Sequence, residues 1–235
     1  MRNLYWSCED FMKKLNKGIK RICPHAFLCY TYKILTRPLP AGDNTLTHPD
    51  AQRWNHRYQQ KRHTSFERPR PFLIENADYL PSYGLALDVA MGLGGNASFL
   101  LSRGLRVVGV EISDVALRQA KARHPALMAV LADINHFYLP TDTFDVILNF
   151  YYLQRDLWPH YKKALRPGGL LIFETLTTEM RTHNPSIDPI YLLAPGELRH
   201  AFADMKILVY EEGWTKTSSD HTRAVASLVA RAPLE

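Results

Sequence analysis

The 235-residue chain contains no apolar run long enough to cross a bilayer, which requires about 20 consecutive apolar residues. It lacks the long apolar stretch and small-residue cleavage site of a secretory signal peptide, so no such leader is expected. Internal repeats and low-complexity tracts are also absent. With 46% hydrophobic and 22% charged residues, the composition is that of an ordinary globular domain with a sizeable core.

Cysteine is scarce: the chain has three, Cys8, Cys23 and Cys29, and all of them precede residue 30. An odd number outside the expected core argues against a disulfide scaffold and predicts a reducing, cytoplasmic environment. Cys23 and Cys29 have no second pair of ligands to complete the roughly four that a zinc site needs. We therefore expect no metal site.

Most of the chain also lacks net charge. The formal charge of +6 at pH 7 resides in residues 1–37, which hold eight Lys or Arg and two Asp or Glu. Residues 38–235 contain 21 basic and 21 acidic residues. A formally neutral body does not favour a nucleic-acid substrate, because phosphate backbones are bound through an excess of positive charge.

The basic first segment has a pattern of its own. Across residues 11–22, apolar residues recur at helical spacing between lysines and arginines, as in an amphipathic helix that makes weak contact with an anionic membrane or partner. A solvated, loosely ordered extension explains the same residues and is favoured, because chain termini are commonly mobile. We expect residues 1–48 to form this extension and residues 49–235 to form the functional domain.

The most informative segment alternates strands and a helix around a glycine-rich turn. An apolar run at 85–90 predicts a strand that leads into small residues, which permit a tight turn. Helical periodicity follows at 96–103, and a β-branched strand at 107–110 ends on Glu111. This acid lies 23 residues beyond Asp88, near the spacing of about 20 expected for a ribose ligand. The series indicates a nucleotide-type cofactor site.

Two cofactor families use this arrangement. Dinucleotide enzymes rest a pyrophosphate on the helix N-terminus behind a G-x-G-x-x-G turn. Here the series is Asp88-x-Ala90-x-Gly92-x-Gly94, which lacks that glycine spacing. Asp88 would repel a pyrophosphate, whereas it could organise the turn around a cationic amino-acid group. The pattern therefore predicts S-adenosylmethionine as the cofactor and disfavours a nicotinamide-dependent oxidoreductase.

These residues resemble the class I S-adenosylmethionine-dependent methyltransferases, whose D-x-G-x-G-x-G motif is matched with Ala90 in the first glycine position. The resemblance extends over roughly residues 49–231. Within the class it is strongest to the tellurite-resistance and thiopurine methyltransferase-like branch. The segments that carry this likeness are residues 54–58 (WNHRY), Asn96, residues 152–157 (YLQRDL) and residues 195–198 (PGEL).

The resemblance implies an α/β fold, a three-layer sandwich around a Rossmann-like, mostly parallel seven-stranded sheet with an antiparallel C-terminal strand. The residue pattern agrees, because strands and helices alternate after residue 85. Apolar runs at 205–211 and 223–231 predict a terminal hairpin. Helices are expected at 50–62 and 71–80, ahead of the first strand.

In such a sheet the ligand lies beyond the carboxyl ends of the strands. Glu111 would accept hydrogen bonds from the ribose hydroxyls, and Asp133 with Ile134 would hold the adenine, unless Asp133 serves as a turn cap. Arg57 would pair with the methionine carboxylate, or else remain in solvent while Trp54 and Tyr58 pack on the sheet. The predicted cofactor-binding residues are Arg57, Tyr58, Asp88, Ala90, Gly92, Gly94, Asn96, Glu111, Ile112, Asp133, Ile134 and Asn149.

The acceptor side is expected after the fourth strand. Residues 149–152 (NFYY) keep the outer residues of the N-P-P-Y motif found in methyltransferases that act on planar amines. Both prolines are missing, which disfavours an adenine or glutamine acceptor. Tyr152 and Arg155 are the predicted catalytic residues. Arg155 would steer an anionic acceptor, or instead form a salt bridge with Asp156 or a helix neighbour. Arg181 and His183 are candidates for a lid.

No catalytic triad is visible in the sequence, and methyl transfer from a sulfonium does not require one. The cofactor supplies an activated carbon, and holding donor and acceptor in line can provide about 7 to 11 kcal/mol. The predicted function is methyl transfer from S-adenosylmethionine to a small, soft or anionic acceptor of the thiol or chalcogen oxyanion type. The alternative is a non-catalytic S-adenosylmethionine-binding regulatory protein, because a fold and a cofactor site do not prove turnover.

Overall fold

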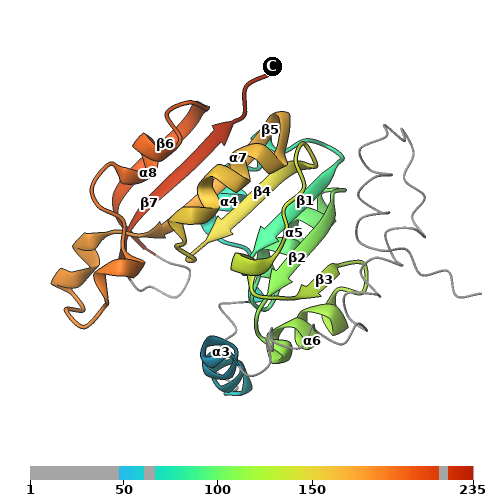
Figure 1. Ribbon diagram of the computed structural model, residues 1–235, viewed down its shortest axis with the longest axis horizontal. Coiled ribbons are helices and arrows are strands. Elements are labelled where there is room, and N and C mark those ends of the chain that lie inside the picture. The colour runs from blue at the N-terminus through green and yellow to red at the C-terminus, as the bar shows by residue number, and fades with distance from the viewer. Residues whose placement is uncertain (1–47, 61–66, 217–221, 235) are drawn as a thin grey trace, which may run out of the picture. The chain divides into compact units, whose positions relative to one another are not determined.

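The computed structural model describes residues 48–60, 67–216 and 222–234 (Figure 1). Within these residues the strands form one seven-stranded sheet in the order β3-β2-β1-β4-β5-β7-β6. The strands are β1 (Leu85–Val89), β2 (Arg106–Glu111), β3 (Met128–Leu131), β4 (Phe144–Phe150), β5 (Leu165–Leu176), β6 (Lys206–Lys216) and β7 (Thr222–Arg231). The α-helices are α3 (Pro49–Gln59), α4 (Pro71–Glu75), α5 (Gly95–Ser102), α6 (Asp114–Arg123), α7 (Trp158–Ala164) and α8 (Glu197–Ala201). Short 3-10 helices are η3 (Ala77–Tyr79), η4 (Ile134–His136), η5 (Arg155–Leu157), η6 (Thr178–Thr182) and η7 (Pro189–Tyr191).

The sheet is parallel over its first five strands and changes direction at the end of the chain. β1 pairs in parallel with β2 and β4, so that Asp88 faces Gly109 on one side and Leu148 on the other. β7 inserts between β5 and β6 and runs antiparallel to both. The predicted α/β class, the mostly parallel sheet and the antiparallel C-terminal strand are therefore confirmed.

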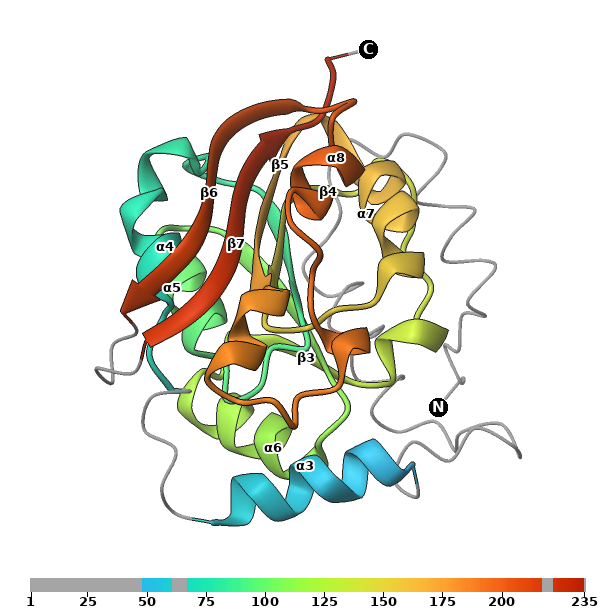
Figure 2. The same cartoon turned by 90° about the vertical axis from the view of Figure 1, so that its left-hand side faces the viewer.

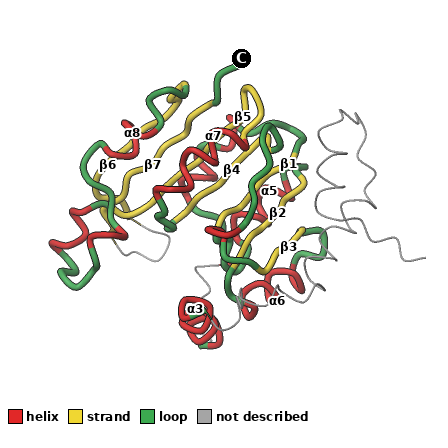
Figure 3. Tube along the Cα trace, in the orientation of Figure 1, coloured by secondary structure: helices red, strands yellow, loops and turns green. Residues whose placement is uncertain are grey.

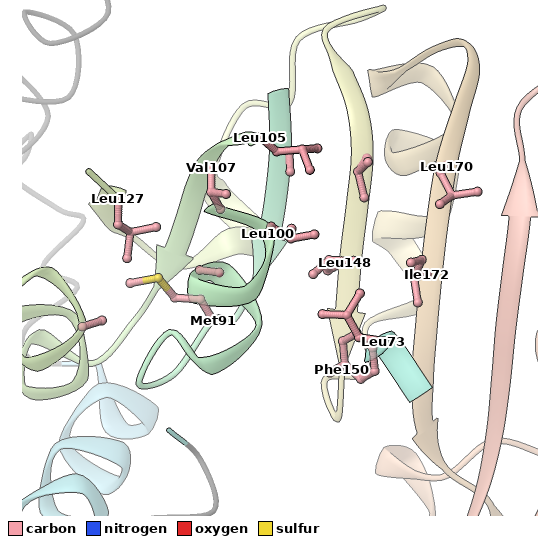
Figure 4. Close-up of a cluster of buried hydrophobic side chains, with 14 of the residues drawn as sticks. Leu73, Met91, Leu100, Leu105, Val107, Leu127, Leu148, Phe150, Leu170 and Ile172 are labelled. Atoms are coloured by element: carbon pink, nitrogen blue, oxygen red, sulfur yellow. The ribbon is translucent and has the colours of Figure 1, made fainter. Parts of the chain in front are cut away.

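Helices pack on both faces of the sheet and give three layers (Figures 2 and 3). Figure 2 shows α4 and α5 on one face and α7 and α8 on the other. On the first face, Leu73 of α4 and Leu100 of α5 belong to the hydrophobic cluster drawn in Figure 4. On the second, Trp158 lies 6.4 Å from Phe173 and 5.8 Å from Phe202, measured between ring centroids. Burial of each large apolar side chain contributes about 1.5–3 kcal/mol, which holds the layers together.

The helix expected at 71–80 is interrupted in the structure. α4 ends at Glu75, and the separate 3-10 helix η3 begins at Ala77. Asn76 is the C-cap of α4: its backbone leaves the helical region, while its backbone N–H and its side-chain amide both donate to the Phe72 carbonyl, over 3.3 and 2.9 Å. Asparagine favours helix ends and turns because its side chain bonds to nearby backbone, a preference that helical periodicity alone does not reveal.

The helix expected at 50–62 is observed as α3, which begins one residue earlier at Pro49. Proline is suited to the first helical position, and His48 caps the helix by accepting a hydrogen bond from the Asp50 backbone at 3.2 Å. Helix α3 ends at Gln59, because Gln60 is already extended. His48 precedes the predicted division at 48/49, which stays a prediction because residues 1–47 lie outside the described part of the chain.

Three predictions fall outside the described residues: the basic amphipathic pattern at 11–22, the loosely ordered extension and the environment of the cysteines. They stay predictions. Among the helices that the structure does describe, none is long and apolar enough to traverse a bilayer.

Candidate active site

A cavity of about 390 Å³ lies at the carboxyl ends of β1 and β2, where the sequence predicts the cofactor. Ten of the predicted site residues line it: Tyr58, Asp88, Ala90, Gly92, Asn96, Glu111, Ile112, Asp133, Ile134 and Tyr152. Four others, Arg57, Gly94, Asn149 and Arg155, are not among the described residues that line this cavity. The wall also contains residues that the sequence analysis did not assign to it: His48, Asp50, Arg68 and Arg70.

The turn after β1 has left-handed backbone at alternate positions, with φ of 49° at Ala90, 57° at Gly92 and 79° at Gly94. Glycine adopts this conformation readily, whereas an alanine does so at a cost of about 1–2 kcal/mol. Gly94 therefore serves the shape of the turn and the start of α5 rather than the cavity wall. The substitution of Ala90 for the first glycine of the motif leaves local strain in the site.

Chain segments from outside the turn pack closely on its glycines. A Cβ on Gly92 would lie 2.8 Å from the Tyr58 hydroxyl, and one on Gly95 would collide with the Arg68 carbonyl. The Asn96 side chain accepts a hydrogen bond of 2.9 Å from the backbone N–H of Arg70. The segment before α4 is thus fixed over the turn, and the glycines make room for it.

Glu111 is held rigidly at the end of β2. Its two carboxylate oxygens accept hydrogen bonds of 2.8 Å from the backbone N–H groups of Gly92 and Ser113. Burial raises the pKa of Glu111, and these hydrogen bonds oppose the rise. Ile112 is a third backbone donor to this carboxylate, and because a carboxylate offers about four lone-pair sites, acceptor capacity remains for a ligand. This arrangement suits the ribose role predicted for Glu111.

Asp88 is the unusual group of the site. It is 1% exposed, and its Oδ2 atom has no hydrogen-bond partner among the described residues. Burial raises the pKa of Asp88 to about 7. A buried carboxylate without a full set of donors is costly, so a cationic group entering the adjacent cavity would be stabilised by it. The residues present therefore fit the ammonium-bearing amino-acid part of S-adenosylmethionine.

Asp133 and Tyr152 form the opposite part of the wall. Asp133 accepts a hydrogen bond of 3.0 Å from the Asn135 backbone and so caps η4 while also lining the cavity. The Tyr152 hydroxyl donates to the Asn135 side chain over 3.4 Å, and burial raises the pKa of Tyr152 to about 12. Asp133 can therefore cap the 3-10 helix η4 and still offer its carboxylate to a ligand in the cavity.

Asn149 does not line the cavity, but it is hydrogen-bonded to Tyr152, which does. Its amide donates a hydrogen bond of 2.6 Å to the Tyr152 carbonyl, and its oxygen accepts one of 3.1 Å from the Tyr161 hydroxyl. The residue is buried, and both ends of its amide are engaged within the protein. Asn149 therefore shapes the turn at 150–152, and its contact with the cofactor stays a prediction.

Arg155 forms an ion pair with Glu197. Its Nε and Nη2 atoms lie 2.5 and 2.9 Å from the Glu197 carboxylate, and its guanidinium also donates to the carbonyls of Ile190 and Leu192. The alternative in which Arg155 pairs with an acid is the one observed, but the acid is Glu197 and not Asp156. Arg155 ties the 190–192 segment to α8 and does not reach the cavity.

The pre-core helix α3 contributes in a way that differs from the prediction. Tyr58 lines the cavity and stacks on Trp54, with ring centroids 5.6 Å apart. The guanidinium of Arg57 lies 5.3 Å from the centre of the Trp54 ring. Arg70 instead reaches the cavity, where its guanidinium lies 4.6 Å from the centre of the Tyr151 ring. The sequence offers one signal for it, two arginines alternating with prolines at 68–71.

The fold is that of the class I S-adenosylmethionine-dependent methyltransferases, and it is similar to solved structures of this kind. Residues 86–169 match the family model described as a methyltransferase domain. The matched segment runs from β1 into the beginning of β5 and includes the glycine turn, Glu111 and Asp133.

Individual relatives support this assignment over different parts of the chain. A malonyl-[acyl-carrier protein] O-methyltransferase of Enterobacter lignolyticus is 28% identical over 102 residues, 41% of each chain. The chain thus spans less than half the length of that curated relative. A solved S-adenosylmethionine-dependent methyltransferase of Methanosarcina mazei has a TM-score of 0.58 at 16% identity, covering 68% of this chain and 97% of that one. TehB of Haemophilus influenzae has a TM-score of 0.56 at 18% identity, covering 68% and 61%.

Proposed function

We propose that this protein transfers a methyl group from S-adenosylmethionine to a small-molecule acceptor. The observation that carries the proposal is the pairing of Asp88, buried with an unsatisfied oxygen, with Glu111, fixed by the glycine turn, on one cavity wall. Bound there, the cofactor supplies a methyl carbon activated by the sulfonium. The remaining requirement on the protein is to hold donor and acceptor in line and to exclude water.

Each part of the wall has a task in this proposal. Glu111 accepts from the ribose hydroxyls, Asp133 and Ile134 hold the adenine, and Asp88 compensates the ammonium group. Arg68, which lines the cavity, takes the carboxylate role predicted for Arg57. Guanidinium groups suit this role because they form paired hydrogen bonds with carboxylates.

The acceptor is proposed to be small, soft and of the thiol or chalcogen oxyanion type. The formally neutral body and the missing prolines after Asn149 support this choice against nucleic acids and planar amines. Arg70 takes over the steering role expected of Arg155, because it lies at the cavity and Arg155 is paired with Glu197. The likeness to the tellurite-resistance and thiopurine branch favours the same acceptor class.

Titration calorimetry with S-adenosylhomocysteine and with NAD tests the cofactor assignment. We expect binding of the first and none of the second. Glu111→Ala should weaken S-adenosylhomocysteine binding by about 1.5–3 kcal/mol, the range for hydrogen bonds to a charged group. Glu111→Gln retains one acceptor and should lose less. Asp114→Ala, which changes an acid on α6 that pairs with Arg118, is the control. Unchanged affinity in Glu111→Ala would remove the ribose assignment.

Turnover is tested separately with methyl-labelled S-adenosylmethionine and a panel of thiols, chalcogen oxyanions, nucleic acids and proteins. Release of S-adenosylhomocysteine with the small soft acceptors is expected. Labelling of nucleic acid or protein with the small acceptors inert would overturn the acceptor class. Tight cofactor binding without release on any acceptor would favour the regulatory binding protein instead.

A further inference from the structure

A second cavity, of about 310 Å³, lies beside the cofactor cavity, against α4 and the ends of β5, β6 and β7. Arg70 and Tyr151 line both cavities, so these two side chains form the partition between them. The second cavity therefore begins where the cofactor cavity ends. A molecule in it would approach a bound cofactor past Tyr151.

The partition is built from a constrained tyrosine between charged groups. Tyr151 follows β4 with a left-handed φ of 56°, an uncommon value for a residue with a side chain. The guanidinium carbons of Arg70 and Arg223 lie 4.6 and 5.0 Å from the centre of its ring. Unusual backbone of this kind persists where the surroundings determine it, and it is concentrated in binding sites.

The end of the second cavity next to the partition carries an excess of positive charge, from Arg70, which lines it, and from Arg223, which does not line it but lies against the Tyr151 ring. The single buried acid at this end is Glu174, which is 6% exposed and accepts a hydrogen bond of 3.0 Å from the Ser227 hydroxyl. Arg70 and Arg223 are both close enough to act on this carboxylate electrostatically. Two guanidinium groups against one carboxylate favour an anionic group of a ligand at this end.

Away from the partition, the described lining residues have the opposite character. They include Glu75 of α4 and Glu211 of β6 as exposed carboxylates, with Lys216 as the cation. Glu212 also lines the cavity, but its carboxylate accepts hydrogen bonds from the Gly196 backbone and the Tyr210 hydroxyl. The excess of carboxylates away from the partition favours a cationic group of a ligand.

His183, one of the two residues predicted to form a lid, reaches the rim of the second cavity. The His183 ring lies 4.4 Å from the Trp214 ring, measured between centroids, and Trp214 belongs to the wall of the second cavity. A loop in contact with the rim fits a compartment that a substrate must enter and leave.

We propose that the second cavity is the acceptor subsite and that it selects a small nucleophile carrying an amino group. The nucleophilic end, a thiolate or another soft anion, lies against Arg70 and Tyr151, and the ammonium end lies between Glu75 and Glu211. This inference rests on the proposed methyltransferase function. It replaces a uniformly anionic acceptor with one that carries both charges.

Three small thiols that differ in their second group test the charge selection: cysteamine, 2-mercaptoethanol and 3-mercaptopropionate. Binding of each to the full-length protein saturated with S-adenosylhomocysteine is measured by ligand-observed NMR titration, which needs no turnover. Cysteamine should bind about three- to tenfold more tightly than 3-mercaptopropionate, the range for two exposed charge contacts. The double variant Glu75→Gln, Glu211→Gln should abolish that preference and leave S-adenosylhomocysteine affinity unchanged.

Glu179→Gln, an exposed acid outside both cavities, is the matched control and should retain the preference. Equal binding of the three thiols, preference for 3-mercaptopropionate, or preference for cysteamine that survives the double variant would each overturn the subsite while the cofactor assignment stands. Failure of S-adenosylhomocysteine to bind would refute the proposed function, and the subsite with it.

Discussion

The side-chain oxygen of Asn55 accepts a hydrogen bond of 2.6 Å from the Ser113 hydroxyl, which is itself the N-cap of α6. The same oxygen accepts a second bond of 3.2 Å from the Val115 backbone. Asn55 therefore joins α3 to the first turn of α6, two residues beyond Glu111. The segment 54–58 therefore contributes to the site in two ways. Asn55 attaches α3 to α6, and Tyr58 lines the cavity.

Asn55→Ala should separate α3 from the body and loosen the wall that Trp54 and Tyr58 form. Loss of one hydrogen-bonding side chain of this kind costs about 0.5–1.5 kcal/mol of stability. We expect S-adenosylhomocysteine affinity, measured by calorimetry, to fall about fivefold or more because the cofactor must reorder the helix. His56→Ala, an exposed change on the same helix, should leave both quantities unchanged. Wild-type affinity in Asn55→Ala would mean that the joint does not support the site.

Ala90→Gly should stabilise the protein, although most substitutions by glycine do the reverse. The φ of 49° at Ala90 is one that glycine adopts without strain. Relief of about 1–2 kcal/mol is partly offset by the greater freedom of glycine in the unfolded chain, so a gain of about 0.5–1 kcal/mol is expected in denaturant unfolding. Ala122→Gly, in the right-handed backbone of α6, should instead lose about 1 kcal/mol. A loss in both variants would argue against strain at Ala90.

Much of the fold follows from local patterns in the sequence. The run of apolar residues before Ala90 and the spacing from Asp88 to Glu111 are each contained within one strand–helix–strand unit. Such units have a fixed handedness and pairing, so their periodicity determines the sheet with little further information. The glycine turn and the positions of Glu111 and Asp133 at the cavity are predictable for the same reason.

The remaining site residues depend on contacts that no periodicity encodes. Arg155 and Glu197 are 42 residues apart, and only the folded chain brings the guanidinium to that acid. Arg70 precedes the first strand and reaches Tyr151 after the fourth. Asn149 has the position of a ligand at a strand end, but the neighbouring Tyr161 and Tyr152 use both ends of its amide. Competing hydrogen bonds of this kind are visible only in three dimensions.

The Arg155–Glu197 pair should act on stability rather than on acceptor choice. The pair is partly exposed, so its coupling is expected to be about 0.5–1 kcal/mol after solvent screening. A double-mutant cycle of Arg155→Ala and Glu197→Gln, followed by denaturant unfolding, measures it. Turnover of anionic and neutral acceptors should fall by similar factors in Arg155→Ala. A selective loss of the anionic acceptors would restore the steering role to Arg155.

Asp88 should give the site a pH dependence near neutrality. Its pKa in the folded protein is about 7, raised by burial from an ordinary 3.8, so the folded state binds this proton more tightly than the unfolded chain does. The protonated carboxyl group contributes its full stabilisation below about pH 4. Between about pH 4 and pH 7 the free energy of unfolding falls by about 1.4 kcal/mol per pH unit on account of this group. Denaturant unfolding at a series of pH values measures this loss.

Asp88→Asn removes the titrating group and should flatten the difference in stability between pH 4 and pH 7. Other buried acids, Glu111 and Glu174, have pKa values raised by burial and remain in both proteins, so the informative quantity is the difference between wild type and variant. Cofactor affinity should change in the opposite sense. Because the ionised carboxylate stabilises a cationic amino group, S-adenosylhomocysteine should bind wild type more tightly as the pH rises through 7, and Asp88→Asn should lack that rise. Parallel pH profiles of binding and stability in the two proteins would mean that Asp88 does not meet the cofactor as an anion.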